Sequence, residues 1–304
     1  MTDRVRIVEV GPRDGLQNEA RALTADERVT LIHRLGDAGL TEIEAGAMVS
    51  PSRIPQMSGS DAVLSRLTHD GGRRYPVLVP NLKGLDAALA AGARDIAVFG
   101  AASETFSQRN IQCGIEESLR RFEPVVARAR DLGLRVRGYV SCVAGCPYEG
   151  AIAPGKVADV AHALYLMGCE EISLGDTIGI GTPSSILAML DAVGRRVPMR
   201  HLAGHYHDTR GMALANIFAS LQAGVRCFDA SVGGLGGCPY ADGASGNVAT
   251  EEVVYLLHGM GYQTGIDLKA LVRTAWWACG LLGTEPASKL AHALKNAHAA
   301  KEAS

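Results

Sequence analysis

Two histidines separated by one residue, His205 and His207, are the side chains of this sequence best suited to bind a metal ion together. They end an apolar run, Leu202–His207, that is typical of a β-strand, and residues i and i+2 of a strand point to the same face. Tyr206 must therefore point to the opposite face. Two imidazoles at one strand end could bind a single divalent cation. A pair of hydrogen-bonded interior histidines is the alternative.

Two further side chains could supply oxygen ligands to the same ion. Asp14 follows the first apolar run of the chain and carries an anionic oxygen, while Asn247 can add a carbonyl oxygen. Nitrogen and oxygen ligands with open positions are typical of Mg²⁺ or Mn²⁺, whereas zinc prefers three histidines or thiolates. We therefore predict a metal site formed by Asp14, His205, His207 and Asn247. Asn247 could also cap the helix expected over Ala249–Leu257, and Asp14 could be a salt-bridged turn residue.

A positive charge stands beside these ligands. Arg13 directly precedes Asp14, and a guanidinium there could stabilise the negative charge that develops on a thioester or carboxylate. Glu44, in the second strand-like run, would then orient Arg13. The alternative is a buried structural ion pair of Arg13 with Glu44 or Glu9.

A glycine-rich loop carries the thiol of Cys238. The glycines around it are Gly233, Gly234, Gly236, Gly237, Gly243 and Gly246. Such a segment cannot form a rigid helix or strand, and it is a candidate lid over a substrate. Cys238 could donate a proton or react as a nucleophile, or it could be an ordinary surface cysteine.

The elements that must position these residues alternate along the chain in a regular way. Eight short β-branched runs are separated by helical stretches such as Ala25–Gly36 and Ser184–Val193, which indicates a parallel sheet of βα units. The runs are Arg6–Val10, Glu42–Ala47, Pro76–Pro80, Asp95–Gly100, Arg135–Ser141, Glu171–Gly175, Leu202–His207 and Cys227–Val232. Several helices end at a glycine, which adopts the left-handed conformation cheaply. No G-x-G-x-x-G follows the first run, so a dinucleotide-binding sheet is not favoured.

We therefore predict an α/β fold, a (β/α)₈ TIM barrel. The active site of such a barrel lies at the C-terminal ends of its strands, where the polar residues above fall. The 304 residues suit a single catalytic domain, with a tail over residues 284–304 that forms a last helix at Ala291–Ala300 or frays.

Composition excludes several classes of partner. The formal charge of −2 gives no reason to expect a nucleic acid or an anionic membrane as partner, and no apolar run reaches the roughly 18 residues of a membrane span. No targeting peptide precedes the first run. The seven cysteines are scattered, as free thiols in a reducing compartment are. Cys142 and Cys146 have no second ligand pair nearby for zinc. We expect a cytoplasmic, bacterial protein.

Four long motifs of the chain resemble those of 3-hydroxy-3-methylglutaryl-CoA lyases. They are Val8–Glu19 (VEVGPRDGLQNE), Ser141–Gly150 (SCVAGCPYEG), Ile172–Gly179 (ISLGDTIG), and Ser231–Ala241 (SVGGLGGCPYA) with Gly243–Asn247 (GASGN). The resemblance extends from about Arg6 to Leu290. After Glu44 the chain departs from it, because Ser52, Arg53 and their neighbours stand where family members usually have Thr-Ser-Phe and a Lys-Trp pair.

The resemblance implies a TIM-barrel lyase that splits 3-hydroxy-3-methylglutaryl-CoA into acetyl-CoA and acetoacetate, in leucine degradation or ketone-body formation. It implies Mg²⁺ or Mn²⁺ on the four ligands predicted above, with Arg13 at the substrate carbonyl, Glu44 supporting Arg13 and Cys238 as the thiol of the mobile loop. It also places Gln17, Asp176 and Glu251 in or around the pocket, the first two as substrate-binding residues. The partner would be a small acyl-CoA, and a homodimer or homotetramer is compatible with it.

Other interpretations of the same residues remain open at this stage. The substrate could be a related 3-hydroxyacyl-CoA, or the chain could be a Claisen-condensing synthase of the same superfamily. Such synthases are usually longer, with an added regulatory domain. A Schiff-base aldolase needs a lysine at the barrel mouth, yet the lysines fall on expected loops and helices. A barrel that binds CoA without catalysis would show no turnover with Mn²⁺.

Overall fold

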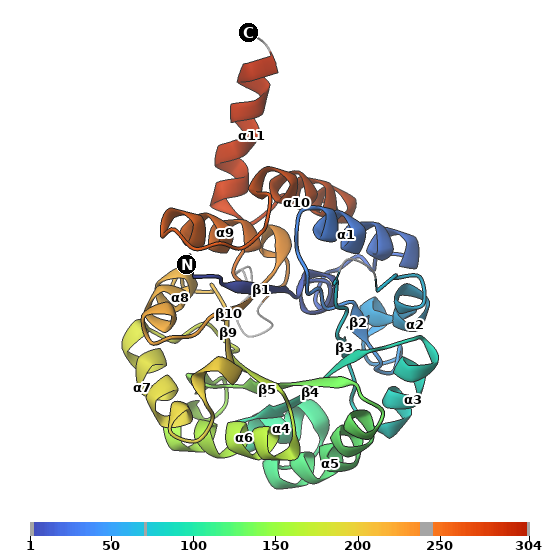
Figure 1. Cartoon of the computed structure of the whole chain (residues 1–304), viewed down its shortest axis with the longest axis vertical. Coiled ribbons are helices and arrows are strands. Elements are labelled where there is room, and N and C mark those ends of the chain that lie inside the picture. Colours follow the sequence, from blue (N-terminus) through green and yellow to red (C-terminus); the bar gives the residue numbers. More distant parts are fainter. Residues whose placement is uncertain (1–2, 70–71, 238–245, 303–304) are drawn as a thin grey trace.

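The computed structural model describes residues 3–69, 72–237 and 246–302. Within these residues, eight parallel strands form one sheet in the order β1-β10-β9-β8-β5-β4-β3-β2 (Figure 1). They are β1 (Arg6–Glu9), β2 (Gly46–Ala47), β3 (Val77–Leu78), β4 (Asp95–Ala101), β5 (Arg135–Ser141), β8 (Glu171–Asp176), β9 (Leu202–Tyr206) and β10 (Cys227–Ala230). The backbone of Glu9 closes the ring, since it donates to Glu42 O and accepts from Glu44 N at 3.0 and 2.8 Å. The predicted barrel of eight strands is confirmed.

Two of the strands are much shorter than the runs that predicted them, and local chemistry explains this. The carbonyl of Ala45, just before β2, accepts a bond from the Arg28 guanidinium at 3.1 Å instead of extending a strand ladder. Pro76 and Pro80 bracket β3, and proline has no N–H to donate to a neighbouring strand. The ladder near β2 continues only as isolated bridges, such as Glu9 with Ile43.

Helices surround the sheet (Figure 1). Those that follow the barrel strands are α1 (Ala25–Asp37), α2 (Ser60–Leu64), α3 (Leu82–Ala90), α4 (Glu104–Ile111), α5 (Ile115–Asp131), α6 (Pro154–Met167), α7 (Pro183–Gly194), α8 (Ala213–Gln222) and α9 (Thr250–Gly259). Thr24 begins α1 through a capping box with Glu27. Gly168 ends α6 with φ of 111°, as the glycine pattern predicted. A short hairpin of β6 (Gly145–Cys146) and β7 (Gly150–Ala151) follows β5.

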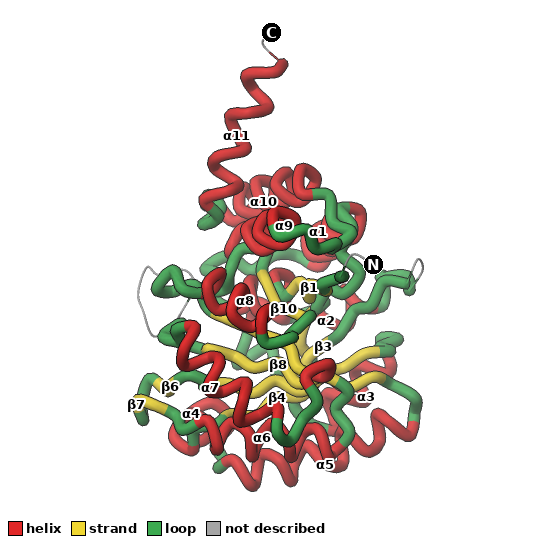
Figure 2. Tube along the Cα trace, turned by 60° about the vertical axis from the view of Figure 1, so that its left-hand side comes forward, coloured by secondary structure: helices red, strands yellow, loops and turns green. Residues whose placement is uncertain are grey.

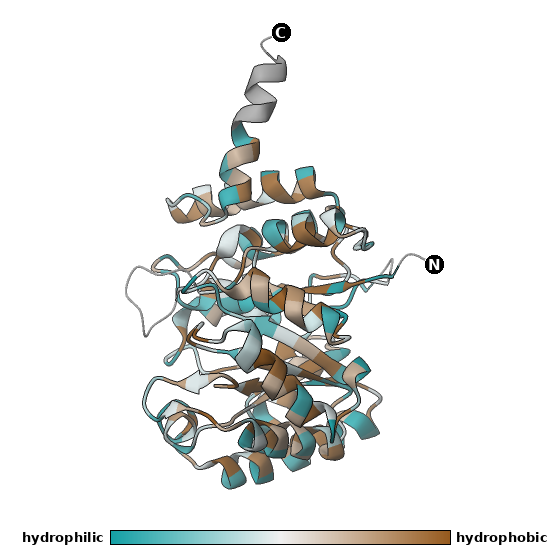
Figure 3. Ribbon diagram, turned by 90° about the vertical axis from the view of Figure 1, so that its left-hand side faces the viewer, coloured by the Kyte–Doolittle hydropathy of each residue, from teal (hydrophilic) through white to brown (hydrophobic). Residues whose placement is uncertain are grey.

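Two more helices complete the described chain. The helix α10 (Leu268–Leu282) packs against α1 and α9, and α11 (Lys289–Glu302) extends away from the barrel (Figure 2). The predicted tail helix is present, slightly longer than expected. Apolar and polar residues alternate along the outer helices (Figure 3). Within the described residues, no helix is long and apolar enough to cross a membrane.

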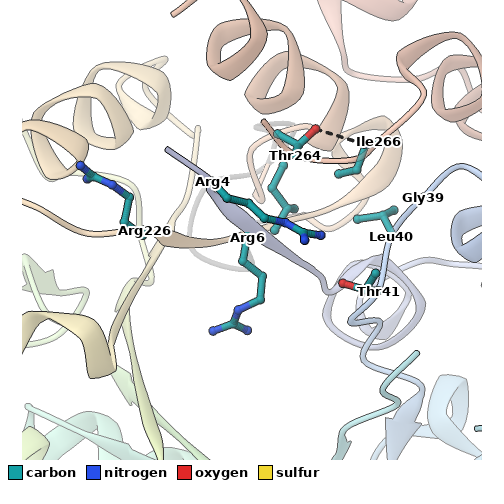
Figure 4. Close-up of a pocket in the computed structure, with 9 residues that line it drawn as sticks. Arg4, Arg6, Gly39, Leu40, Thr41, Arg226, Thr264 and Ile266 are labelled. Carbon is teal, nitrogen blue, oxygen red and sulfur yellow. Dashed lines mark hydrogen bonds between the residues drawn. The ribbon is translucent and has the colours of Figure 1, made fainter. Parts of the chain in front are cut away.

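The N-terminal ends of the strands carry arginines that are largely neutralised. A cavity of about 210 Å³ at this end is lined by Arg4, Arg6 and Arg226 among others (Figure 4). Arg6 pairs with Glu42 and Glu171, and Arg226 pairs with Asp3. These pairs neutralise two of the three arginines that line this cavity.

Candidate metal and substrate site

The turn after β1 brings Arg13 and Asp14 to the C-terminal mouth of the barrel. This turn is the π-helical element η1 (Gly11–Gly15). Arg13 donates from Nε to Glu44 Oε2 at 2.7 Å and from Nη1 to Asp14 Oδ1 at 2.6 Å. Burial alone would raise the pKa of Asp14, but the charges of Arg13 and of the nearby histidines outweigh it and lower the pKa to about 2. Asp14 is therefore ionised at neutral pH.

The two histidines project together from the end of β9, as predicted. Their ring centroids lie 5.4 Å apart, whereas the Tyr206 hydroxyl lies on the other face, 2.9 Å from Ser220 Oγ of α8. Asp14, His205 and His207 each offer one ligand atom, and these atoms all lie within 4.8 Å of one another. Burial first, and then the neighbouring His205, lower the pKa of His207 to about 4, so it is neutral and able to bind a metal.

One observation tests directly whether a cation fits here. Nδ1 of His207 is buried and has no hydrogen-bond partner among the described residues. A buried polar atom without a hydrogen-bond partner costs free energy. This nitrogen belongs to His207, which could bind one metal ion together with Asp14 and His205. The donors present are imidazole nitrogen and carboxylate oxygen, a set that suits a divalent cation.

Asn247 lies beside this cluster, with its amide nitrogen toward it. Nδ2 donates to Asp14 Oδ2 at 2.9 Å and to Leu235 O at 3.2 Å, so its oxygen would have to turn to reach a cation. Gly236 permits this packing, because it has φ of +109° and a Cβ there would lie 2.8 Å from the amide nitrogen. The structure thus brings all four predicted ligands together.

A buried aspartate that sequence reasoning missed holds His205 in place. Asp229 of β10 accepts from His205 Nδ1 at 3.0 Å, from Ser173 Oγ at 2.7 Å and from Arg137 at 2.6 and 3.0 Å. Burial opposes the imidazolium form of His205, but the hydrogen bond and charge of Asp229 outweigh it and raise the pKa of His205. The bond at Nδ1 leaves Nε2 directed at Asp14, 4.0 Å away.

A second residue missed from the sequence is Tyr139 of β5. It lines the cleft, and its hydroxyl accepts from Arg137 Nη1 at 2.8 Å. The Arg13 guanidinium lies over its ring, 5.5 Å from the centroid. Burial raises the pKa of Tyr139 well above its usual value, so the phenol stays protonated beside the charged cluster.

The cluster forms the inner end of a cleft of about 960 Å³, a size typical of sites for substantial small molecules. Arg13, Asp14, Gln17, His205 and His207 all line it. Oε1 of Gln17 is buried without a hydrogen-bond partner among the described residues. Gln17 therefore lines the cleft with a side chain whose oxygen has no partner among the described residues, and its role as a substrate-binding residue stays a prediction.

Three predicted residues lie behind the cleft surface instead of on it. Glu44 is fully buried behind Arg13; burial raises its pKa and the guanidinium opposes the rise. The Asp176 carboxylate accepts from Ile180 N and Gly181 N at 3.2 and 2.8 Å, and it does not line the cleft. Glu251 is buried and accepts from Gly233 N at 2.9 Å.

Glu9 supports the same stretch of chain as Glu251. It accepts from Gly11 N at 2.8 Å, Val232 N at 2.9 Å and Thr250 Oγ1 at 2.7 Å. The two acids therefore fix the beginning of the glycine-rich segment from below. Cys238, predicted as the thiol of that segment, lies outside the described residues.

Comparisons with known proteins show which family the chain resembles. Residues 4–276 match the HMGL-like family. The chain is 56% identical to hydroxymethylglutaryl-CoA lyase of Pseudomonas mevalonii over 290 residues, 95% of this chain and 96% of that protein. The crystal structure of hydroxymethylglutaryl-CoA lyase from Pseudomonas aeruginosa is 53% identical, with a TM-score of 0.94 over 97% of this chain and 99% of that one. An HMG-CoA lyase from Acinetobacter baumannii, in complex with coenzyme A and 3-methylmalate, is 36% identical, with a TM-score of 0.91 over 96% and 95%.

Proposed function

The chain belongs to the HMGL-like family, and from this premise we propose that it is a carbon–carbon lyase that cleaves 3-hydroxy-3-methylglutaryl-CoA into acetyl-CoA and acetoacetate. The observation that carries this proposal is the cluster of Asp14, His205 and His207 beside Arg13 at the inner end of the cleft. The relatives, which are named as lyases, do not favour the alternative of a condensing synthase.

We propose that Asp14, His205, His207 and Asn247 hold Mg²⁺ or Mn²⁺. The convergence of the first three and the partnerless Nδ1 of His207 support this. A bound cation would orient the oxygens of the substrate and favour loss of the hydroxyl proton. Asn247 would contribute after its amide turns its oxygen toward the ion.

The residues of the chain would then transfer protons to and from the substrate and stabilise the negative charge of the enolate. Asp14 or His205 accepts the proton of the 3-hydroxyl group, and the oxygen electrons form the ketone of acetoacetate. The electron pair of the C2–C3 bond passes to the thioester, whose enolate Arg13 stabilises by preorganised N–H donors. Glu44 fixes that guanidinium from behind. A proton from an acid, for which we propose Cys238, converts the enolate carbon into the methyl group of acetyl-CoA.

The same proposal extends to the substrate-binding residues and to the cellular compartment of the protein. Gln17 offers its free buried acceptor to the acyl part of the substrate, whereas Asp176 would act through the segment that it holds. The described cysteines outside residues 238–245 are all free and buried, which supports action in a reducing compartment such as the cytoplasm.

Product analysis tests this function. Purified protein with Mn²⁺ should convert 3-hydroxy-3-methylglutaryl-CoA into equal amounts of acetyl-CoA and acetoacetate, with loss of activity in EDTA and recovery when Mn²⁺ returns. Borohydride should trap no adduct, even though Lys83 lines the cleft. Absence of cleavage with added metal, or cleavage that EDTA leaves intact, contradicts the proposal.

A further inference from the structure

The guanidinium of Arg28, on α1, is fully buried although it carries a positive charge. All of its printed hydrogen bonds go to uncharged oxygens, and within the described part of the chain no carboxylate pairs with it. Burial lowers its pKa to about 10, and its Nε has no hydrogen-bond partner among the described residues. A buried charge without a counter-ion costs free energy. Stability alone therefore does not account for this side chain.

The Arg28 guanidinium joins the beginning of β2 to the beginning of α2. Nη2 donates to Ala45 O and to Ser60 Oγ, each at 3.1 Å, and Nη1 donates to Ser58 O at 3.1 Å. Ser60 Oγ also accepts from Ala47 N at 3.1 Å. Arg28 and Ser60 together therefore hold the residues of β2 against α1 and α2.

This stretch of β2 has few other restraints. The strand is only two residues long, Gly46 and Ala47, and glycine leaves the backbone freer than any other residue. A Cβ at Gly46 would lie 2.6 Å from Nη2 of Arg28, so the guanidinium occupies the space of a side chain there. Gly46 also lies after Glu44, where the chain departs from the family pattern. Arg28 thus supplies a restraint that the strand itself lacks.

The peptide that Arg28 holds directly follows Glu44. The Glu44 carboxylate is fully buried and accepts from Arg13 Nε at 2.7 Å through Oε2, while Oε1 has no hydrogen-bond partner among the described residues. Since one bond to Arg13 is the carboxylate's printed contact, the backbone must fix its position. A shift at Ala45 would move the carboxylate and with it the Arg13 guanidinium.

We propose that Arg28 is a positioning residue, which holds the Ala45 carbonyl and so keeps Glu44 in place behind Arg13. This inference rests on the proposed function, in which Arg13 stabilises the enolate. Misplacement of a catalytic group by about 1 Å can cost about 100-fold in rate. Glu44 N still donates to Glu9 O at 2.8 Å, so we expect a smaller loss when Arg28 is replaced.

Steady-state kinetics of two replacements tests this role. Arg28→Met removes the charge and the donors but keeps an unbranched side chain, and Arg28→Lys restores the charge and part of the donors. The value of kcat should fall about tenfold in Arg28→Met and about threefold in Arg28→Lys, with KM within about twofold of wild type, because Arg13 acts mainly on the transition state. Arg34→Met is the matched control, since Arg34 is an exposed arginine of the same helix; it should keep the wild-type kcat.

A double variant and a stability measurement separate this role from a merely structural one. In a Glu44→Gln background, Arg28→Met should lower kcat by less than about twofold further, because both changes act on Arg13 through the same carboxylate. The urea midpoint of Arg28→Met should lie within about 0.5 M of wild type, since loss of a buried charge offsets loss of its hydrogen bonds. Unchanged kcat, an equal fall in both backgrounds, or a kcat loss that follows a large fall of the midpoint overturns the inference. If Arg28→Met does not fold, Arg28→Lys undergoes the same comparison.

Hydrogen exchange followed by mass spectrometry gives a readout that does not need turnover. The amides of residues 44–47 should exchange about tenfold faster in Arg28→Met than in wild type, and at the wild-type rate in Arg34→Met. Equal exchange in all three proteins overturns the inference. A wild type that differs from Arg28→Met in this way but cleaves nothing would leave the positioning of Glu44 standing and overturn the proposed function.

Discussion

Replacement of Asp229 by asparagine tests whether the buried network behind His205 supports both stability and metal binding. Asp229→Asn keeps the shape of the side chain and removes its charge. The carboxylate is fully buried and meets two arginine N–H groups, one hydroxyl and one imidazole. The variant therefore leaves Arg137, itself 5% exposed, with Glu171 as its remaining anion.

The magnitude follows from this burial. Removal of one partner from a buried ion pair costs about 3 to 5 kcal/mol, because the other charge stays buried without compensation. Since the bond to Glu171 at 2.8 Å survives, we expect the lower end, about 3 kcal/mol of unfolding free energy. His205 also loses the anion that orients its ring, and loss of such a supporting partner lowers metal affinity about 10- to 100-fold.

Two measurements follow these effects separately. Urea unfolding by circular dichroism gives the free energy, and calorimetric titration with Mn²⁺ at low urea gives the affinity. Asp191→Asn is the control, because Asp191 pairs with Arg195 at 2.6 Å but both side chains are largely exposed; it should cost no more than about 0.5 kcal/mol. An Asp229→Asn variant as stable as this control, with wild-type affinity for Mn²⁺, would refute the reasoning.

Three further changes test other parts of the site. Burial raises the pKa of Glu251 to about 8, so the folded protein keeps a proton on this carboxyl that the unfolded chain releases above pH 4.5. Between pH 4.5 and 8, the unfolding free energy of wild type should therefore fall by up to about 1.4 kcal/mol per pH unit relative to that of Glu251→Gln. Parallel plots of unfolding free energy against pH for the two proteins would contradict this. Gly236→Ala places a methyl group against Asn247 at positive φ and should lower Mn²⁺ affinity by tenfold or more, unlike Gly259→Ala in open space. In thermal-shift assays, Mn²⁺ should raise the melting temperature of wild type but not that of His207→Ala. An equal rise for the two proteins would mean that the ion binds elsewhere.

The parts of the site that could be predicted depend on geometry within one strand. Alternation along β9 was enough to place His205 and His207 together and to turn Tyr206 toward α8, and both outcomes hold in the structure. Position at a strand end then indicated Asp14 as their neighbour. These inferences need no knowledge of which strands pair.

Other outcomes depend on the register between strands, which a single sequence does not reveal. The family resemblance placed Asp176 in or around the pocket. In the sheet it pairs with Tyr206, and neighbouring residues in register share a face, so it points away from the barrel axis as Tyr206 does. His205 pairs instead with Asp229 of β10, and this register brings the missed aspartate onto the histidine.

The missed residues nevertheless leave a trace in the sequence that can be used in similar barrels. In β5 the order Val136, Arg137, Gly138, Tyr139 alternates apolar or small with polar, and the polar members are buried. In a sheet that faces water, the polar members of such an alternation would be exposed. Here they point into the barrel, because helices cover the outer face of the sheet and favour apolar residues there. A strand whose polar residues alternate with apolar ones and point inward is thus the expected pattern where charged side chains fill the interior of the barrel. The Arg137–Asp229 pair, 92 residues apart in the chain, shows why the partners emerge only once the ring closes.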